Sequence, residues 1–251
     1  MVHRGPAAGR LTPAGAAPAR PAVVVVTGAN RGIGRELVRR LAVRGDCPVM
    51  AVRDLERGRA AVRDLHASDG VRLDVVHLDV TDAASCARAA DEVSRRHGRV
   101  DALVNNAAPP RDLRATAAAT DLEAVQHAWD ATVLGAWRAT QAFLPLLRRS
   151  AAGRVVNVSA EAASLVNMGG GAPAFRVSKA ALNALTRMLA AELAREGIAV
   201  NSVCPGWAAT DTRDGGGRSA AEAAGSVLQA IDLPPGGPTG EFLRDGRPLP
   251  W

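Results

Sequence analysis

The chain of 251 residues contains no tyrosine, and aromatic residues make up only 3% of it. Lysine is almost as scarce, because Lys179 is the only lysine among 31 basic residues. The lack of tyrosine excludes any mechanism in which a phenol side chain serves as general acid or base. Although the net charge is +6, the arginines form no basic cluster interleaved with aromatic residues, so the sequence predicts no nucleic-acid partner.

The three cysteines, Cys47, Cys86 and Cys204, match no zinc or disulfide spacing. We therefore expect reduced thiols, as in a cytoplasmic protein. The five histidines are scattered along the chain, so no metal site is expected. No apolar run approaches the ~18 residues that a membrane-spanning helix requires, and no membrane partner is expected.

Residues 1–21 have the composition of a disordered tail, rich in alanine, proline and glycine and without the apolar segment of a secretory signal. From residue 22 on, short β-branched runs alternate with amphipathic segments. Strands are expected at residues 22–27, 49–52, 71–78, 100–104, 154–158 and 198–203, and helices at 33–44, 56–67, 83–97, 121–149 and 173–195. This alternation predicts one α/β domain over residues 22–251, with a Rossmann-type, doubly wound parallel sheet. The small, glycine-rich stretch 208–225 is expected to form a lid over the site.

The first strand is followed by a glycine-rich turn with the sequence TGANRGIG, from Thr27 to Gly34. Glycines in such a turn let the backbone approach a pyrophosphate group closely. The helix that begins there directs free N–H groups and the positive end of its dipole at the same anion. Because the motif lies between a predicted strand and a predicted helix, it indicates a dinucleotide site.

With its TGxxxGxG spacing, the turn resembles that of the short-chain dehydrogenase/reductase family, and the resemblance extends over nearly all of residues 22–251. Asn105-Asn106-Ala107 is similar to the family's segment after the fourth strand, although Ala108 stands where glycine is usual. The end of the chain, Gly240-Glu241-Phe242 followed by Arg247 to Trp251, is similar to a carbonyl-reductase-like branch.

The resemblance implies that the cofactor is NADP(H). Arg53 at the end of the second strand would pair with the 2′-phosphate, where an acidic residue would have favoured NAD. Arg31 resembles a second phosphate contact, and Asp79 resembles the family's adenine contact. The implied cofactor-binding positions are Gly28, Asn30, Arg31, Gly32, Ile33, Gly34, Arg53, Asp79, Val80, Asn105, Ala107, Lys179, Pro205, Gly206 and Thr210.

The family's proton-transfer residues are a tyrosine and a lysine four residues apart on one helix, an upstream serine and an asparagine on the preceding helix. The matching positions here are Phe175, Lys179, Ala160 and Thr132. Ser159 is one residue away from the serine position and should point to the other face of the strand. The resemblance thus implies that only Lys179 is kept, with ribose binding as the role left to it.

Three hypotheses follow, in order of preference. The first is a non-redox enzyme that cyclises, isomerises or dehydrates a polyketide-like small molecule. The second is an NADPH-dependent reductase of an activated acceptor, such as an enone, a quinone or an iminium ion, because a simple ketone would form an alkoxide with no acid beside it. The third is a binding protein without catalysis that senses NADP(H).

Glu161 and Asp211 are candidate replacement acids or bases. The polar groups that would help them are Ser159, Ser164 and Asn167, in an apolar pocket lined by Phe175, Ala160, Val166, Met168 and Trp207. Besides the small-molecule substrate, the expected partner is a second copy of the chain, in a homodimer or homotetramer formed through helices 121–149 and 173–195.

Overall fold

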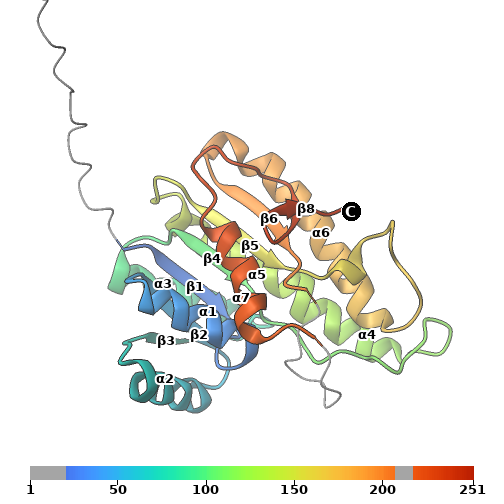
Figure 1. Ribbon diagram of the computed structural model, residues 1–251, viewed down its shortest axis with the longest axis horizontal. Helices are drawn as coiled ribbons and strands as arrows, with labels where there is room; N and C mark the ends of the chain where they lie inside the picture. The colour runs from blue at the N-terminus through green and yellow to red at the C-terminus, as the bar shows by residue number, and fades with distance from the viewer. Residues whose placement is uncertain (1–20, 207–216) are drawn as a thin grey trace, which may run out of the picture.

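The computed structural model describes residues 21–206 and 217–251 (Figure 1). Within these ranges, eight strands form one sheet in the order β3-β2-β1-β4-β5-β6-β7-β8. Each neighbouring pair from β3 to β7 is parallel, and the last strand is antiparallel to β7. The predicted doubly wound α/β fold is therefore confirmed.

The strands are β1 (Val23–Thr27), β2 (Cys47–Val52), β3 (Asp74–His77), β4 (Ala102–Asn105), β5 (Arg154–Val158), β6 (Ala199–Val203), β7 (Phe242–Arg244) and β8 (Arg247–Pro248). The α-helices are α1 (Gly32–Val43), α2 (Leu55–Asp69), α3 (Ala83–His97), α4 (Leu122–Trp129), α5 (Gly135–Leu147), α6 (Pro173–Leu193) and α7 (Ala220–Ile231). Shorter helical turns are η1 (Asp130–Leu134), η2 (Glu161–Ala163) and η3 (Ala194–Glu196).

Strand β1 consists almost entirely of valine because both of its faces are buried. Val23 and Val25 pack with α3, α5 and α6, whereas Val24 and Val26 pack with α1, α2 and α7. The two helical layers cover opposite faces of the sheet, and α7 lies beside α1 in Figure 1. Each fully buried valine contributes about 1.5–3 kcal/mol of transfer free energy, so this central strand anchors both cores.

Helix boundaries follow local capping chemistry. The Asp54 carboxylate accepts a hydrogen bond from the Arg57 N–H at the start of α2, and the Asp82 carboxylate caps α3 in the same way. Both helices end at a glycine in the left-handed conformation, Gly70 and Gly98.

Three sequence-based expectations need correction. The helix expected over residues 121–149 is interrupted by the π-helical turn η1, which separates α4 from α5. The strand expected over 71–78 begins only at Asp74. Residues 220–225, expected to belong to a lid, form the first half of α7, while residues 207–216 lie outside the described part of the chain.

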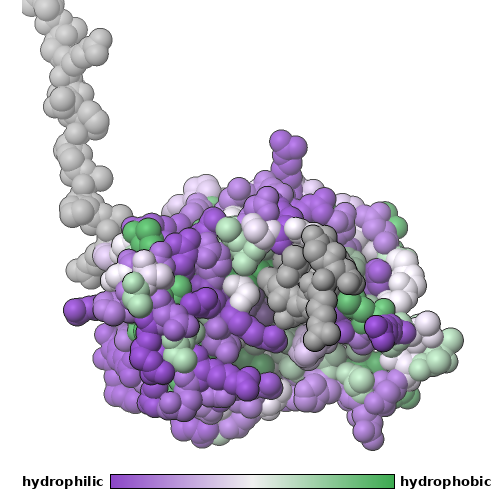
Figure 2. All heavy atoms as spheres, turned by 60° about the horizontal axis from the view of Figure 1, so that its bottom comes forward, coloured by the Kyte–Doolittle hydropathy of each residue, from purple (hydrophilic) through white to green (hydrophobic). Residues whose placement is uncertain are grey.

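Hydrophilic residues dominate the face of the molecule in Figure 2, where apolar residues form small scattered groups. None of the helices in the described ranges is long and apolar enough to span a bilayer. The same ranges contain no cluster of three histidine, cysteine or acidic side chains that could hold a metal ion.

Candidate functional site

The carboxyl ends of β1 to β6 meet at one edge of the sheet because these strands are parallel. Ligands of doubly wound sheets bind at this edge. The segments that follow the six strands there are 28–34, 53–54, 78–80, 106–108, 159–160 and 204–206. Every described position that the sequence analysis assigned to the cofactor, except Lys179, therefore follows or ends one of these strands.

The glycine turn after β1 fits an anion. Gly28 and Gly32 have φ angles of 64° and 55°, in the left-handed region where glycine is favoured. Arg31 precedes α1 in an extended conformation, and its side chain makes no capping hydrogen bond to the helix. Among the described residues, the N–H groups of the first turn can therefore meet a ligand, and the positive end of the helix dipole favours a pyrophosphate there.

The loop after β4 holds this turn in place. The Asn106 side-chain amide donates hydrogen bonds to the carbonyl oxygens of Thr27 and Gly28, at 2.9 and 3.3 Å. The Thr27 hydroxyl accepts from the backbone N–H groups of Asn106 and Ala107, both at 3.0 Å. No role for Asn106 alone is predicted from the sequence, and these hydrogen bonds show that it restrains the shape of the turn.

Arg53 and Asp79 lie after neighbouring strands, β2 and β3. Arg53 is exposed, so its guanidinium can meet a phosphate group that approaches from solvent. Hydrogen bonds from the hydroxyl and the N–H of Thr81 lower the pKa of Asp79, and the charge of Arg53 lowers it further. Asp79 is therefore ionised at neutral pH and restrained by Thr81.

Helix α6 carries Lys179 into the protein. The side chain is buried, and Nζ donates a hydrogen bond to the carbonyl oxygen of Val158, at 2.6 Å, at the end of β5. Burial lowers the pKa of Lys179 to about 8, and the positive charge of Arg111 contributes to this shift. The only lysine of the chain is thus a restrained cation below the carboxyl edge of the sheet.

Phe175 lies one helical turn before Lys179, and the two share a face of α6. The guanidinium carbon of Arg111 stands over the Phe175 ring, 5.1 Å from its centroid. This distance is within the range of a cation–π interaction. Arg111 belongs to the loop after β4, and no feature of the sequence predicted its contact with Phe175.

Thr132 lies in the π turn η1 and is buried, and η1 packs against α6. π turns of this kind occur frequently at functional sites. Ala160 follows β5 in an extended conformation at the start of η2. Ser159 is buried, and its hydroxyl faces the Lys179 carbonyl at 3.5 Å. Thr132, Ala160, Phe175 and Lys179 thus come from three segments, because η1 and the start of η2 both pack against α6, which carries the last two residues.

The Glu161 carboxylate forms an ion pair with Arg244 of β7, so it is engaged by a cation. Ser164 is buried, and its hydroxyl donates to the Trp251 carbonyl oxygen at 3.2 Å. Val166, expected to line an apolar pocket, is 75% exposed. Trp207, Thr210 and Asp211 lie outside the described residues.

A row of buried polar side chains runs beneath the site. The Asn105 amide donates to the Asn157 side-chain oxygen at 2.8 Å, and the Asn157 amide donates to the Thr186 hydroxyl at 2.8 Å. The hydroxyls of Thr186 and Ser202 are also 2.8 Å apart. The Asn105 amide nitrogen is engaged in this row and in a bond to Thr140. Its side-chain oxygen is buried and has no hydrogen-bond partner among the described residues.

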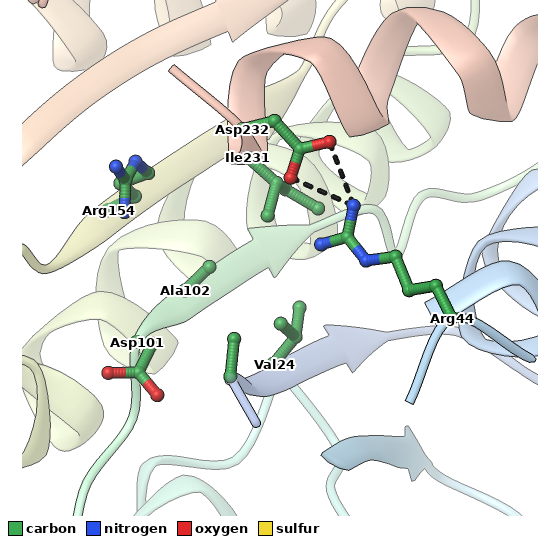
Figure 3. Close-up of a pocket in the computed structure, with 8 residues that line it drawn as sticks. Val24, Arg44, Asp101, Ala102, Arg154, Ile231 and Asp232 are labelled. Carbon is green, nitrogen blue, oxygen red and sulfur yellow. Dashed lines mark hydrogen bonds and ion pairs between the residues drawn. The ribbon is translucent and has the colours of Figure 1, made fainter. Parts of the chain in front are cut away.

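The opposite edge of the sheet has a hollow of about 240 Å³. Figure 3 shows Asp101, Ala102 and Arg154 lining it near the starts of β4 and β5. Arg44 binds both oxygens of the Asp232 carboxylate, at 2.8 and 2.9 Å. This hollow lies at the amino ends of the strands, and the charges of its lining residues are balanced, so it is separate from the candidate site at the carboxyl edge.

Comparison with known proteins agrees with this geometry. Residues 22–219 match the family model described as short chain dehydrogenase. The (−)-isopiperitenone reductase of Mentha piperita is 32% identical, over 90% of this chain and 96% of that protein. Among solved structures, an NADPH-bound carbonyl reductase from chicken fatty liver superposes with a TM-score of 0.82 at 29% identity, covering 92% of this chain and all of that one.

The salutaridine reductase of Papaver somniferum is also similar in structure. It superposes with a TM-score of 0.78 at 27% identity, covering 88% of this chain and 99% of that one. Because the family model covers most of the chain, this protein belongs to the short-chain dehydrogenase family.

Proposed function

We propose that this protein is an NADPH-dependent reductase of activated acceptors, such as enones, quinones or iminium ions. The observation that carries the proposal is the side chain of Phe175, one helical turn before the buried Lys179. The phenyl ring has no hydroxyl group, so it can neither donate nor accept a proton. Thr132, Ala160 and Phe175 stand, in this proposal, in place of the family's asparagine, serine and tyrosine.

The residues at the carboxyl edge fit NADPH, which supplies a hydride when bound. The N–H groups at the start of α1 would bind the pyrophosphate, and Arg53 would bind the 2′-phosphate. The Lys179 ammonium, with donors beyond the one used by Val158, would bind the hydroxyl groups of the nicotinamide ribose. The NADPH bound by the chicken carbonyl reductase supports this assignment.

The class of substrate that would accept the hydride follows from the lack of a phenol hydroxyl at Phe175. A simple ketone that accepts a hydride becomes an alkoxide, which needs an acid within hydrogen-bond distance. A conjugated carbonyl compound or a quinone spreads the new charge over several atoms, and an iminium ion becomes neutral. These acceptors need less help from a protein acid, so they suit a site with Phe175 and Ala160.

The sequence alone favoured a non-redox enzyme with Glu161 as its acid or base. The ion pair of Glu161 with Arg244 gives the non-redox hypothesis no support. The similar proteins are named reductases. A binding protein without catalysis has no observation in its favour either. We therefore rank the reductase of an activated acceptor first.

The test follows NADPH absorbance while the purified protein meets ketones, enones, quinones and iminium ions, with mass spectrometry of the products. We expect NADPH oxidation and a product heavier by two hydrogens with activated acceptors only. Phe175→Tyr should not restore ketone reduction, because Thr132 and Ala160 also lack the usual groups. A product of unchanged mass with intact NADPH would make this a non-redox enzyme. A large gain in the rate of ketone reduction by Phe175→Tyr would show that a tyrosine at this position is enough for the enzyme to reduce simple ketones.

Arg53 provides a second test. We expect NADPH to bind more tightly than NADH, and Arg53→Ala to weaken NADPH binding about 10–100-fold, the equivalent of one charged hydrogen-bond pair. NADH binding should change little. Fluorescence titration with both cofactors measures this, and Arg57→Ala, which alters an exposed arginine of the neighbouring helix α2, is the matched control. Equal loss for both cofactors would contradict the 2′-phosphate assignment.

Self-association through α4, α5 and α6 stays a proposal, which the molar mass in solution tests. Two large apolar side chains on these helices, Trp137 and Met188, are 36% and 51% exposed in the single chain. Contact with a second copy would remove this apolar surface from water.

A further inference from the structure

Arg111 is held firmly at the site by the residues around it. Its neighbour Asp112 accepts hydrogen bonds from the backbone N–H groups of Ala174 and Phe175, at 2.8 and 3.2 Å. The Ala115 carbonyl oxygen accepts another from the Ala172 N–H at 3.2 Å. The loop after β4 is thus attached to the start of α6 by two residues that follow Arg111, and this attachment restrains the backbone next to Arg111.

Among the residues that the structure describes, the charged side chains near the start of α6 are mostly positive. Arg111 and Lys179 both lie close to Phe175, and each is near enough to the other to interact electrostatically. The Asp112 carboxylate is used by two N–H groups of the helix start. The Arg176 guanidinium donates to backbone carbonyl oxygens of Gly171 and Ala162, so it is turned to the loops. Among the described side chains, a group bound beside Phe175 therefore lies near two cations, Arg111 and Lys179.

We propose that Arg111 binds the acceptor oxygen that becomes negatively charged, which makes the substrate a conjugated carbonyl compound, an enone or a quinone. This inference rests on the proposed reductase function and narrows its substrate class. An iminium ion carries a positive charge before hydride transfer and none afterwards. Two neighbouring cations repel such a substrate and gain nothing from its product, whereas they attract an enolate or a hydroquinone anion.

The step balances without a protein acid. For an enone, the hydride of NADPH forms a bond to the β-carbon, the C=C π-bond breaks, and the electron pair moves to the carbonyl oxygen as an enolate. Arg111 donates hydrogen bonds to this oxygen and stays protonated throughout, because guanidinium does not lose its proton in this pH range. A proton from water then adds to the α-carbon. NADPH is oxidised, and the enone is reduced to the saturated ketone.

The first test compares Arg111→Met with Arg114→Met, a matched change of an exposed arginine in the same loop. We expect Arg111→Met to lower kcat for enones by about 10²-fold or more, the usual effect of losing one oxyanion donor. Arg111→Lys should recover part of this loss. NADPH binding should be unchanged in all three variants, which also verifies that they fold. Equal kcat in the wild type and Arg111→Met, or a preference for iminium ions, would overturn the proposal.

The second test needs no turnover. The probe is 4-nitrophenol, an enolate mimic whose anion is coloured, added to protein that is saturated with NADP⁺. We expect the wild type to bind the phenolate form, and Arg111→Met to weaken this binding about tenfold or more, while Arg114→Met behaves as the wild type. If no acceptor is reduced but phenolate binding depends on Arg111, the proposed reductase function fails and the anion site stands. Absent or Arg111-independent phenolate binding overturns the inference.

Discussion

Replacing Lys179 by methionine is expected to raise the free energy of unfolding of the cofactor-free protein at pH 7 by about 1–2 kcal/mol. The ammonium is buried with one hydrogen bond, to Val158, and its pKa is lowered to about 8 from 10.5. A shift of this size corresponds to a penalty of about 3 kcal/mol for keeping the charge in the folded state. Loss of the bond to Val158 offsets part of the gain.

The sign of the pH dependence follows from this shift. Below pH 8, Lys179 is charged in both states, and the folded state bears the full cost of burial. Between pH 8 and 10.5, the unfolded chain binds more protons than the folded one, so the stability of the wild type rises with pH. Methionine has no proton to lose, and its advantage should shrink and then reverse over this window.

Urea unfolding of the wild type and of Lys179→Met at pH 7 and pH 10 measures the difference. Arg195→Met serves as control, because it removes an exposed cation just after the same helix and should leave the pH dependence unchanged. A methionine variant that is less stable than the wild type at both pH values would show that Lys179 is neutral, or well solvated, in the folded protein. The variant should also bind NADPH more weakly, since the ribose partner is lost.

Gly34→Ala should lower the free energy of unfolding by about 1–2 kcal/mol and weaken NADPH binding at least about tenfold. An added Cβ would stand 2.7 Å from the Asn106 amide nitrogen and 2.9 Å from both the Gly28 oxygen and the Ala29 Cα. Two of these atoms belong to the backbone, so they cannot move away from the added Cβ without a change in the conformation of the turn. This cost exceeds the gain of about 1 kcal/mol that alanine usually brings to a helix.

Thermal unfolding with and without NADPH checks this prediction. Gly169→Ala is the matched control, because nothing lies within 4 Å of the added Cβ and the residue is exposed. If Gly34→Ala binds NADPH as well as the wild type does, the close packing of Asn106 against the turn is not what shapes the pyrophosphate site.

Much of the fold could be predicted from the sequence because its signals are local. Valine runs mark β1 and β5, and the helix expected at residues 83–97 is found with the same bounds. Helix α7 was missed because its first turns, rich in alanine and glycine, continue the composition of the preceding loop. Strands β7 and β8 have only three and two residues, too few for an alternating pattern. Only the pairing of β7 with β6 and of β8 with β7 defines them.

The site could be predicted only in part. Glycine spacing located the turn after β1, and the spacing of Phe175 and Lys179 located α6. The Arg111–Phe175 contact has no sequence signal, because it depends on a loop attached to α6 by Asp112, 63 residues before Phe175. The ion pair joins Glu161 to Arg244, 83 residues later in the chain. Because the carboxylate is bound to this cation, Glu161 is a poorer candidate for a free catalytic acid. Such long-range contacts exist only once the sheet is assembled.

The polar row beneath the site bears on how the strands find their alignment during folding. Asn105 pairs with Asn157, and Asn157 pairs with Ser202, at equivalent levels of β4, β5 and β6. Strands buried on both faces, being largely valine, can slide by one or two residues without exposing anything polar. A slip of β5 by one residue would separate the two asparagines and leave buried amides without partners, at a cost of about 1–3 kcal/mol each. These hydrogen bonds therefore specify the strand register. They favour the native pairing of the strands over shifted pairings that the apolar core alone would tolerate.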